Sequence, residues 1–541
     1  MKTLTSGLAP GSQIIDKMQP MTQHTPKFQE EFSAKLPAMA LLTNLGWSFL
    51  SPEQTLAARG GKQDEVVLRQ TLRTELQKRT FTFAGQEYPL SDKAIDNLIA
   101  EVCSPALNEG LLKANERLYN HLLYGISVNE FVDGKKANPT VALIDWHNPA
   151  NNSFVFTEEL SVTRSGGIGA SFQDTRRPDI VCFVNGIPLV VIEAKRPDGN
   201  AKKGPTIGEG ISQSLRNQRH DEIPQLFVYS QLLLSINGTE GRYGTCGTPA
   251  KFWAAWREED ISEPEMYAIK NTKLSDVQIA TLFGHRPATD LSWYHNLLAG
   301  GELALTGQDQ MLVSLLSPAR LLEMTRFFTL FDKKAGKIVA RYQQVFGIKR
   351  LIERINIKRS DGGREGGVIW HTTGSGKSFT MVFLSKALIL HDSLKQCRIV
   401  VVTDRVDLEN QLSRTFASGG ELAGKKDKDA AMATSGRRLA EQIGKGTERI
   451  IFSLIQKFNT ATKLPECVNT SPNIIVLIDE GHRSQGGENH IRMKQALPRA
   501  AFVAFTGTPL LKDDKTTNKC TNDTDDDITT GAHLSVCSHK H

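Results

Sequence analysis

Residues 177–195 read RPDIVCFVNGIPLVVIEAK and decide the fold of the first half of the chain. Two apolar runs, 180–184 and 187–192, lie on either side of Asn185-Gly186. That dipeptide strongly favours the two-residue turn of a β-hairpin. The sequence therefore predicts two paired antiparallel strands. Asp179 precedes the first strand, and Glu193 and Lys195 follow the second.

The pairing register of this hairpin decides which polar side chains meet. Glu193 and Lys195 share a face because side chains alternate along a strand. A strict two-residue turn would place Asp179 opposite Ile192, on the other face. One extra residue restores the pairing of Asp179 with Glu193. We therefore predict a three-residue loop or a β-bulge, aided by Pro188, which cannot donate a ladder hydrogen bond.

In that register two carboxylates converge beside an ammonium group, which is typical of a metal-dependent nuclease. The oxygens of Asp179 and Glu193 suit Mg²⁺, which keeps several waters and reaches phosphate oxygens. Bound Mg²⁺ lowers the pKa of a water and neutralises charge on the phosphate. We expect Lys195 to orient the attacking water or hold the phosphate. An acid from an upstream helix often completes such a site, and Glu75 and Glu116 are both candidates.

A second group of motifs begins at residues 367–370, a predicted strand. The loop that follows leads into Lys377-Ser378 at the start of a helix, where backbone N–H groups form an anion site. We expect Lys377 to reach the β- and γ-phosphates of ATP and Ser378 to bind Mg²⁺. His371 stands where the strict phosphate-loop pattern has glycine. The predicted ATP-binding residues of this segment are Thr373, Gly374, Ser375, Gly376, Lys377 and Ser378.

An acidic motif follows about a hundred residues later. The apolar run 473–478 predicts a buried parallel strand that delivers Asp479 to the carboxyl edge of a sheet, where ligands bind in this fold class. We expect Asp479 to hold Mg²⁺, Glu480 to polarise the attacking water and His482 to couple the site to its neighbours. Strands and helices alternate from 368 to 505, which indicates a parallel sheet covered by helices.

Composition sets only broad limits on function. The 541 residues carry a net charge of +6, which permits nucleic-acid binding without arguing for it. No apolar run reaches the roughly 18 residues that a membrane span needs. The N-terminal residues lead to no long apolar core, so we expect no secretory signal, and the 7 cysteines include no Cys-x-x-Cys pair. We therefore expect a cytoplasmic protein with reduced thiols and no membrane partner.

These patterns divide the chain into five parts. We expect helices near 38–45 and 68–76, strands at 141–144 and 154–156, and a basic helical piece at 331–355. The parts are a flexible N-terminal arm (1–25), an α/β domain (26–260), a connector with some helix (261–325), an ATP-binding lobe (326–512) and a disordered polar tail (513–541).

The motifs of the second half resemble those of superfamily-two helicases. Residues 479–482 resemble the acid box, and 506–509 resemble the coupling motif. Residues 403–408 and 455–458 resemble segments that touch the DNA backbone. The resemblance implies DNA contacts from Thr403, Arg405, Gln456 and Lys457, coupling roles for His482, Thr506 and Thr508, and an adenine contact from Gln344 within 341–344.

Together with the hairpin, the order of the motifs resembles the restriction (R) subunit of type I restriction-modification enzymes, from about Phe28 to about Lys515. The resemblance implies a PD-(D/E)xK nuclease-type mixed-sheet domain followed by one RecA-like parallel-sheet helicase lobe. It implies ATP-dependent translocation on double-stranded DNA and Mg²⁺-dependent cleavage of unmodified DNA. The implied partners are a methyltransferase (M) subunit and a specificity (S) subunit, which reads the site. The catalytic residues would be Asp179, Glu193, Lys195 and Glu480.

Two features depart from that family pattern. Family members often carry Gln-x-x-x-Tyr on the helix after the second strand; the matching positions here are Gln213 and Asn217, while Gln225 and Tyr229 have the spacing in a strand-like run. Residues from Asp513 onward resemble neither motor lobe, so we expect slow ATP hydrolysis and no translocation without the second lobe's arginine.

Two other functions are alternatives to a restriction subunit. One is a non-catalytic relic that binds DNA or partner subunits, and the other is a helicase-associated repair nuclease.

Overall fold

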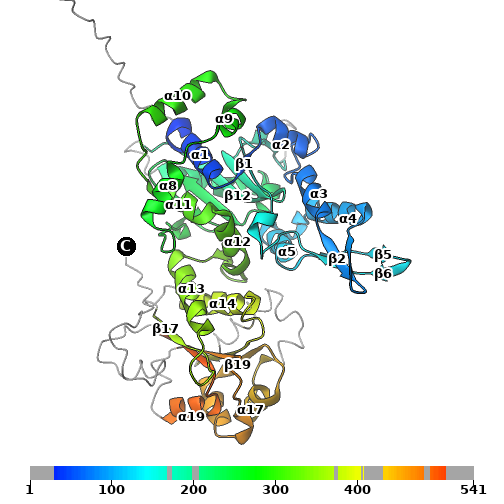
Figure 1. Cartoon of the computed structure of the whole chain (residues 1–541), viewed down its shortest axis with the longest axis vertical. Helices are drawn as coiled ribbons and strands as arrows, with labels where there is room; N and C mark the ends of the chain where they lie inside the picture. The colour runs from blue at the N-terminus through cyan, green and yellow to red at the C-terminus, as the bar shows by residue number, and fades with distance from the viewer. Residues whose placement is uncertain are drawn as a thin grey trace, which may run out of the picture.

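The described part of the chain is built around two β-sheets, one in each half (Figure 1). The computed structural model describes residues 30–166, 174–197, 206–370, 376–403, 431–479 and 488–506, together with Val406 and Ser413. The expected arm (1–25) and tail (513–541) lie outside the described residues. Figure 1 shows α13 (Tyr342–Asn356) and α14 (Lys377–Leu390) at the junction of the two halves.

The first sheet is mixed and has six strands. Two pairs are parallel, the first with the second strand and the fourth with the fifth, and the other pairs are antiparallel. In spatial order the strands are β1 (Ser48–Phe49), β8 (Phe154–Glu158), β11 (Ile180–Val184), β12 (Ile187–Ala194), β13 (Leu232–Ile236) and β14 (Gly241–Gly244).

The predicted hairpin is β11–β12, and its turn has two residues. Asn185 and Gly186 have φ angles of 51° and 83°, as the favoured hairpin turn requires. Val184 pairs with Ile187 across this turn. The turn alone would therefore give the register that keeps the acids apart.

A β-bulge corrects that register, as predicted. Phe183 pairs with Pro188, but Cys182 pairs with Val190, so Leu189 is the extra residue. Beyond the bulge Ile180 pairs with Ile192. This register brings Asp179 level with Glu193. All of β11 and β12 is buried on both faces, so a slip in register would move every side chain into packing that fits a different residue.

Helices and small hairpins surround this sheet. The helices predicted near 38–45 and 68–76 and the strand at 154–156 are confirmed, but the strand predicted at 141–144 ends at Val141. The further elements are η1 (Glu31–Lys35), α1 (Leu36–Asn44), α2 (Pro52–Ala58), α3 (Arg69–Gln77), β2 (Thr80–Phe83), β3 (Gln86–Pro89), α4 (Asp92–Cys103), α5 (Leu111–Tyr124), β4 (Ile126–Ser127), β5 (Glu130–Val132), β6 (Lys135–Ala137), β7 (Thr140–Val141), β9 (Val162–Thr163), β10 (Thr175–Arg176), α6 (Thr206–Asn217) and α7 (Pro224–Phe227).

The connector is a group of five helices among the described residues, more regular than the sequence suggested. Trp47 donates a hydrogen bond from Nε1 to the carbonyl oxygen of Leu316 at 2.8 Å, and α11 packs on α1, so the group is attached to the first domain. The helices are α8 (Glu263–Lys270), α9 (Asp276–Phe283), α10 (Ala288–Ala299), α11 (Gly307–Leu316) and α12 (Pro318–Phe327).

The basic piece at 331–355 is only partly helical, so that prediction was wrong for its first third. Residues 329–339 form the hairpin of β15 (Thr329–Asp332) and β16 (Gly336–Val339), in which Thr329 pairs with Val339. Gly336 has a φ of 75°, a conformation that glycine adopts without strain, and this allows the chain to turn. Helix α13 follows.

The second sheet is fully parallel, as the alternation of strands and helices predicted. Its strands read as continuous apolar runs because helices cover both faces. In spatial order they are β17 (Gly367–Trp370), β21 (Ala501–Thr506), β20 (Ile474–Ile478), β18 (Arg398–Thr403) and β19 (Ile450–Leu454). With α14, the helices are α17 (Gly436–Lys445), α18 (Ile455–Ala461) and α19 (Glu488–Ala496); the helix expected from Leu408 lies outside the described residues.

The described residues include no helix with the length and apolar content that crossing a bilayer requires. The five cysteines placed by the structure, Cys103, Cys182, Cys246, Cys397 and Cys467, are all free thiols, as their scattered positions predicted.

Candidate functional site

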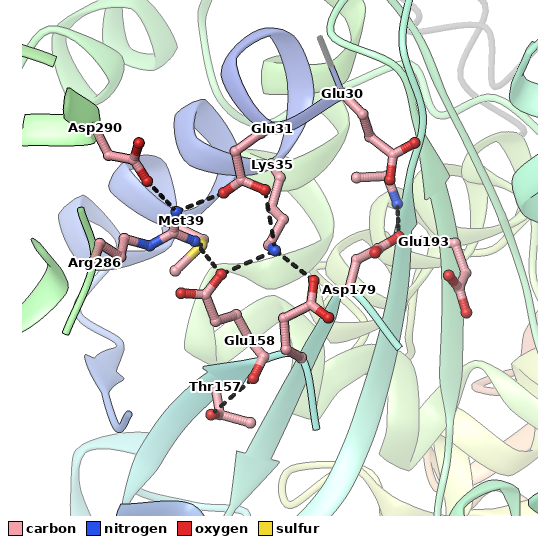
Figure 2. A network of polar contacts seen from close by, with 12 residues as sticks. Glu30, Glu31, Lys35, Met39, Thr157, Glu158, Asp179, Glu193, Arg286 and Asp290 are labelled. Atoms are coloured by element: carbon pink, nitrogen blue, oxygen red, sulfur yellow. Dashed lines mark hydrogen bonds and ion pairs between the residues drawn. The ribbon is translucent and has the colours of Figure 1, made fainter. Parts of the chain in front are cut away.

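The three side chains predicted from the hairpin come together at the ends of β11 and β12. Figure 2 labels two of them, Asp179 and Glu193. Oδ2 of Asp179 accepts a hydrogen bond of 2.8 Å from the backbone N–H of Ala194 and lies 3.4 Å from Nζ of Lys195. Glu193 is completely buried at the end of β12. The bulge at Leu189 produces this meeting, because it sets the register beyond it.

The electrostatics of this cluster favour an added cation. Burial raises the pKa of Glu193 well above its ordinary value, and the negative charge of Asp179 raises it further, while Lys195 opposes both. Burial works against the charge of Lys195, but the carboxylates of Asp179, Glu193 and Glu30 outweigh it and raise the pKa of that ammonium group. The acids around this one ammonium group cannot all ionise without cost, and a bound divalent cation would stabilise their ionised forms.

Helix α6 holds the buried carboxylate of Glu193. Nε2 of Gln213 donates to one oxygen at 2.6 Å, and Nδ2 of Asn217 donates to the other at 3.4 Å. The two amides lie four residues apart and therefore share a helix face. The structure thus brings together Glu193 and the two positions that match the family's Gln-x-x-x-Tyr element.

The alternative pair, Gln225 and Tyr229, lies away from this cluster. Nε2 of Gln225 donates to the carbonyl oxygen of Thr163 at 2.6 Å, and the Tyr229 hydroxyl donates to that of Val102 at 2.8 Å. Their segment begins as helix α7, so its interpretation as a strand was wrong.

A third acid reaches the cluster from upstream, and sequence reasoning missed it. Oε1 of Glu30, the residue before η1, lies 3.6 Å from Nζ of Lys195. Burial raises the pKa of Glu30, Lys195 lowers it, and the nearby charge of Asp179 raises it again. The two acids proposed from the sequence lie elsewhere: Glu75 pairs with Lys78 at 2.6 Å, and Glu116 lies near Lys113 and Lys333.

Glu30 carries no motif that would have marked it, because only the packing of its helix brings it to Lys195. Within the ranges that the structure describes, no three His, Cys, Asp or Glu side chains form a group able to hold a metal ion. Any metal at the hairpin would therefore depend on Asp179 and Glu193 together with water or phosphate oxygens.

The second cluster lies at the carboxyl edge of the parallel sheet. Nζ of Lys377, at the start of α14, lies 3.0 Å from Oδ1 of Asp479, the residue that follows β20. The backbone N–H of Asp479 donates to the carbonyl oxygen of Val402 at 2.9 Å, which fixes the acid beside β18. Thr506 ends β21, the strand between β17 and β20, so it lies between the lysine and acid motifs.

Gln344 on α13 lies beside this cluster. Its Nε2 donates to Oγ1 of Thr380 at 2.9 Å and to the carbonyl oxygen of Gly376 at 3.4 Å, while its Oε1 accepts from the backbone N–H of Arg341. The structure therefore places this side chain against the start of α14. Ser378 occupies the second position of that helix and is partly exposed.

The remaining predicted residues are either at nearby strand and helix ends or beyond the described ranges. Thr403 ends β18 and is buried, Gln456 is exposed on α18, and Nζ of Lys457 donates to the carbonyl oxygen of Ala433 at 2.7 Å. The residues that lie outside the described part of the chain are Thr373, Gly374, Ser375, Arg405, Glu480, His482 and Thr508.

Comparison with protein families matches each half of the chain separately. Residues 27–252 match the family described as type I restriction enzyme R protein N terminus. Residues 343–527 match SWI2/SNF2 ATPase. Among solved structures, the Sulfolobus solfataricus SWI2/SNF2 ATPase core in complex with dsDNA is 14% identical, covers 33% of this chain and 35% of its own, and has a TM-score of 0.25, too low to carry weight.

Curated relatives extend the match across both halves. The type I restriction enzyme HindI endonuclease subunit of Haemophilus influenzae is 30% identical over 503 residues, covering 88% of this chain and 42% of that protein. The putative type I restriction enzyme MjaIXP endonuclease subunit of Methanocaldococcus jannaschii is 28% identical, covering 93% of this chain and 44% of that protein. The chain spans less than half the length of these relatives. Over the part that it spans, the chain is therefore similar to type I restriction enzyme endonuclease (R) subunits in both of its halves.

Proposed function

We propose that this chain carries the nuclease and ATP-binding parts of a type I restriction endonuclease subunit. In this proposal residues 26–260 form a PD-(D/E)xK-type domain that cleaves double-stranded DNA with Mg²⁺, and residues 326–512 form a lobe that binds ATP. The observation that carries it is the meeting of Asp179, Glu193 and Lys195, which depends on the β-bulge at Leu189.

In the nuclease site Asp179 and Glu193 would hold Mg²⁺. When bound, the metal would supply charge for the scissile phosphate and lower the pKa of a water. Gln213 orients Glu193 through its 2.6 Å hydrogen bond, so the carboxylate is held ready. Lys195 would bind the phosphate or the attacking water through its ammonium group. Glu30 would keep that ammonium group charged and directed toward the hairpin.

In the nucleotide site Lys377 would exchange Asp479 for the phosphates of ATP. Their 3.0 Å ion pair holds the lysine in place before nucleotide arrives. Ser378 and Asp479 would then hold Mg²⁺, and Glu480 would act on the water. Gln344 would contact adenine from α13. The residues that would face DNA are Thr403, Arg405, Gln456 and Lys457. The residues that would couple the ATP site to the DNA contacts are His482, Thr506 and Thr508. Translocation, cleavage of unmodified DNA, and assembly with M and S subunits are proposed for the whole protein.

Nicking of supercoiled plasmid by the purified chain, alone and with its M and S subunits, tests the nuclease. Mg²⁺-dependent cutting that disappears in Asp179→Ala and in Lys195→Ala, but persists in Asp96→Ala, is the expected result. Asp96 is a suitable control because it pairs with Arg73 on the surface. A metal-dependent cut that survives Asp179→Ala would assign the activity elsewhere. A chain that never cuts in either setting would favour the non-catalytic binding protein.

A further inference from the structure

A buried network of charged side chains lies beside the hairpin site (Figure 2). At its centre is Glu158, the last residue of β8, whose side chain is 4% exposed. Its oxygens contact Nζ of Lys35 at 3.0 Å, Nε2 of His285 at 2.8 Å and the guanidinium of Arg286. These partners come from two separate stretches of the chain, so the network ties together elements that are far apart in sequence.

The network adjoins the proposed nuclease residues through the backbone. Glu158 pairs with Ile180 across β8 and β11, directly after Asp179. The N–H of Glu159 donates to the carbonyl oxygen of Asp179 at 3.1 Å. Movement of this strand end would therefore move Asp179.

The network also fixes the helix that carries Glu30. Nη1 of Arg286 lies 2.6 Å from Oε1 of Glu31, the neighbour of Glu30, and 3.1 Å from Oδ2 of Asp290. Lys35, one turn further along η1, contacts Glu158 and Glu31. Lys35 thus joins the helix bearing Glu30 directly to the end of β8, and Arg286 adds a second link that comes from the connector.

Replacing Arg286 would be costly for this arrangement. Burial raises the pKa of Glu158, but hydrogen bonding from His285 and the charges of Lys35 and Arg286 lower it to about 2. Removing one partner of a buried ion pair leaves the other charge without compensation. If a neutral residue replaced Arg286, Glu158 would keep only Lys35 as a permanently charged partner. Glu31 would lose its contact with the connector.

We propose that Arg286 is a positioning residue of the nuclease site, which places Glu30 against Lys195 by joining η1 to the end of β8. Arg286 lies between α9 and α10, outside the residues 27–252 that match the N-terminal family. The connector therefore completes the nuclease site rather than only linking it to the ATP-binding lobe. This inference rests on the proposed nuclease function.

Binding of Mn²⁺ to the full chain, measured by titration calorimetry without DNA or nucleotide, provides the test. Asp179→Ala defines the binding that belongs to the hairpin site. We expect Arg286→Met to weaken that binding by roughly tenfold, about 1.4 kcal/mol, because Lys195, no longer held by Glu30, would compete more strongly with the metal for Asp179. Arg286→Lys should restore part of it. Arg320→Met is the matched control. Arg320 is equally buried and also lies in the connector, but it pairs with Glu258 and Asp260.

A double-mutant cycle separates positioning from general damage. If Arg286 acts through Glu30, Arg286→Met should change Mn²⁺ affinity little once Glu30→Gln is present. Amide hydrogen exchange of the metal-free chain supplies a second readout, with faster exchange expected in residues 30–36 of Arg286→Met. Should that variant not fold, Glu31→Gln removes the same link from a partly exposed side chain and should weaken binding by up to about fivefold.

The possible outcomes have separate meanings. Unchanged Mn²⁺ affinity in Arg286→Met and Glu31→Gln, or an equal loss with and without Glu30→Gln, would overturn the positioning role and leave the nuclease proposal intact. If Asp179→Ala binds Mn²⁺ as the unaltered chain does, the metal site itself fails, and the inference fails with it.

Discussion

The ammonium group of Lys195 lies 3.4 Å from the carboxylate of Asp179, across the ends of two adjacent strands. A cation held by Asp179 would share this carboxylate with the lysine, so the two positive charges compete for one oxygen. Lys195→Met should therefore leave Mn²⁺ binding intact or slightly tighter. It should nevertheless reduce DNA cleavage about 10²–10³-fold, the usual cost of losing one group that stabilises developing charge. Parallel calorimetry and plasmid-nicking rates measure both effects, and a large loss of Mn²⁺ affinity would contradict this role.

Glu193→Gln should stabilise the metal-free chain at pH 8. The pKa of Glu193 is raised in the folded state by burial and by Asp179. Between the ordinary pKa and the raised pKa, the folded chain therefore binds more protons than the unfolded chain. The free energy of unfolding therefore falls as pH rises above the ordinary value of about 4.3. Glutamine removes this loss and keeps the bond from Gln213. We expect a melting temperature at least about 2 °C higher, which corresponds to roughly 1 kcal/mol.

The same melting experiment contains its own control. The difference between the two proteins should shrink as the pH falls below about 4, because Glu193 is then mostly protonated in both states. Mn²⁺ should raise the melting temperature of the unaltered chain but not that of Glu193→Gln. A variant that is less stable at pH 8 would mean that the buried carboxylate is well compensated without metal.

Gln213→Ala should impair cleavage more than Asn217→Ala. The Gln213 amide donates to Glu193 at 2.6 Å, whereas the Asn217 amide lies at 3.4 Å, near the limit for a hydrogen bond. Loss of an orienting partner costs roughly 10–100-fold in metal affinity or activity, and we expect Gln213→Ala to fall in that range. Cleavage rates at saturating and limiting Mg²⁺ compare the variants. A stronger effect at Asn217 would show that this residue takes the place of the family's tyrosine.

Lys377→Ala should weaken ATP binding without affecting the nuclease site. The 3.0 Å ion pair with Asp479 would be lost, and the phosphates would lose their ammonium partner. We expect the affinity for a fluorescent ATP analogue to fall at least roughly tenfold, about 1.4 kcal/mol. Mn²⁺ binding at the hairpin should remain, and Asp179→Ala should bind the analogue normally. Loss of both activities in either variant would indicate damage that spreads between the two sites.

Sequence periodicity was sufficient where one local rule decided the structure. The bulge at Leu189 followed from the requirement that Asp179 and Glu193 share a face, and Pro188 marked its place. The parallel strands followed from apolar runs ended by motif residues, as in the case of Asp479. The hairpin at 329–339 was missed because its basic residues resemble a helical surface and only Gly336 signals the turn.

Contacts between segments that are distant in sequence could not be predicted from local sequence patterns. Glu30 reaches Lys195 because Arg286 and Lys35 hold its helix, and these residues are separated by some 250 positions in the chain. Neither the charge of Glu30 nor its spacing distinguishes it from Glu75 and Glu116, which were equally plausible from helical pattern alone. Tertiary packing of the connector made the selection.

The proposed nuclease requires one divalent cation bound between Asp179 and Glu193. Anomalous diffraction from crystals of the chain grown with Mn²⁺ would locate that cation. We expect a manganese peak that both carboxylates contact, with Lys195 shifted from Oδ2 of Asp179. Crystals with manganese bound elsewhere, and with Asp179 still held only by Ala194 and Lys195, would contradict it.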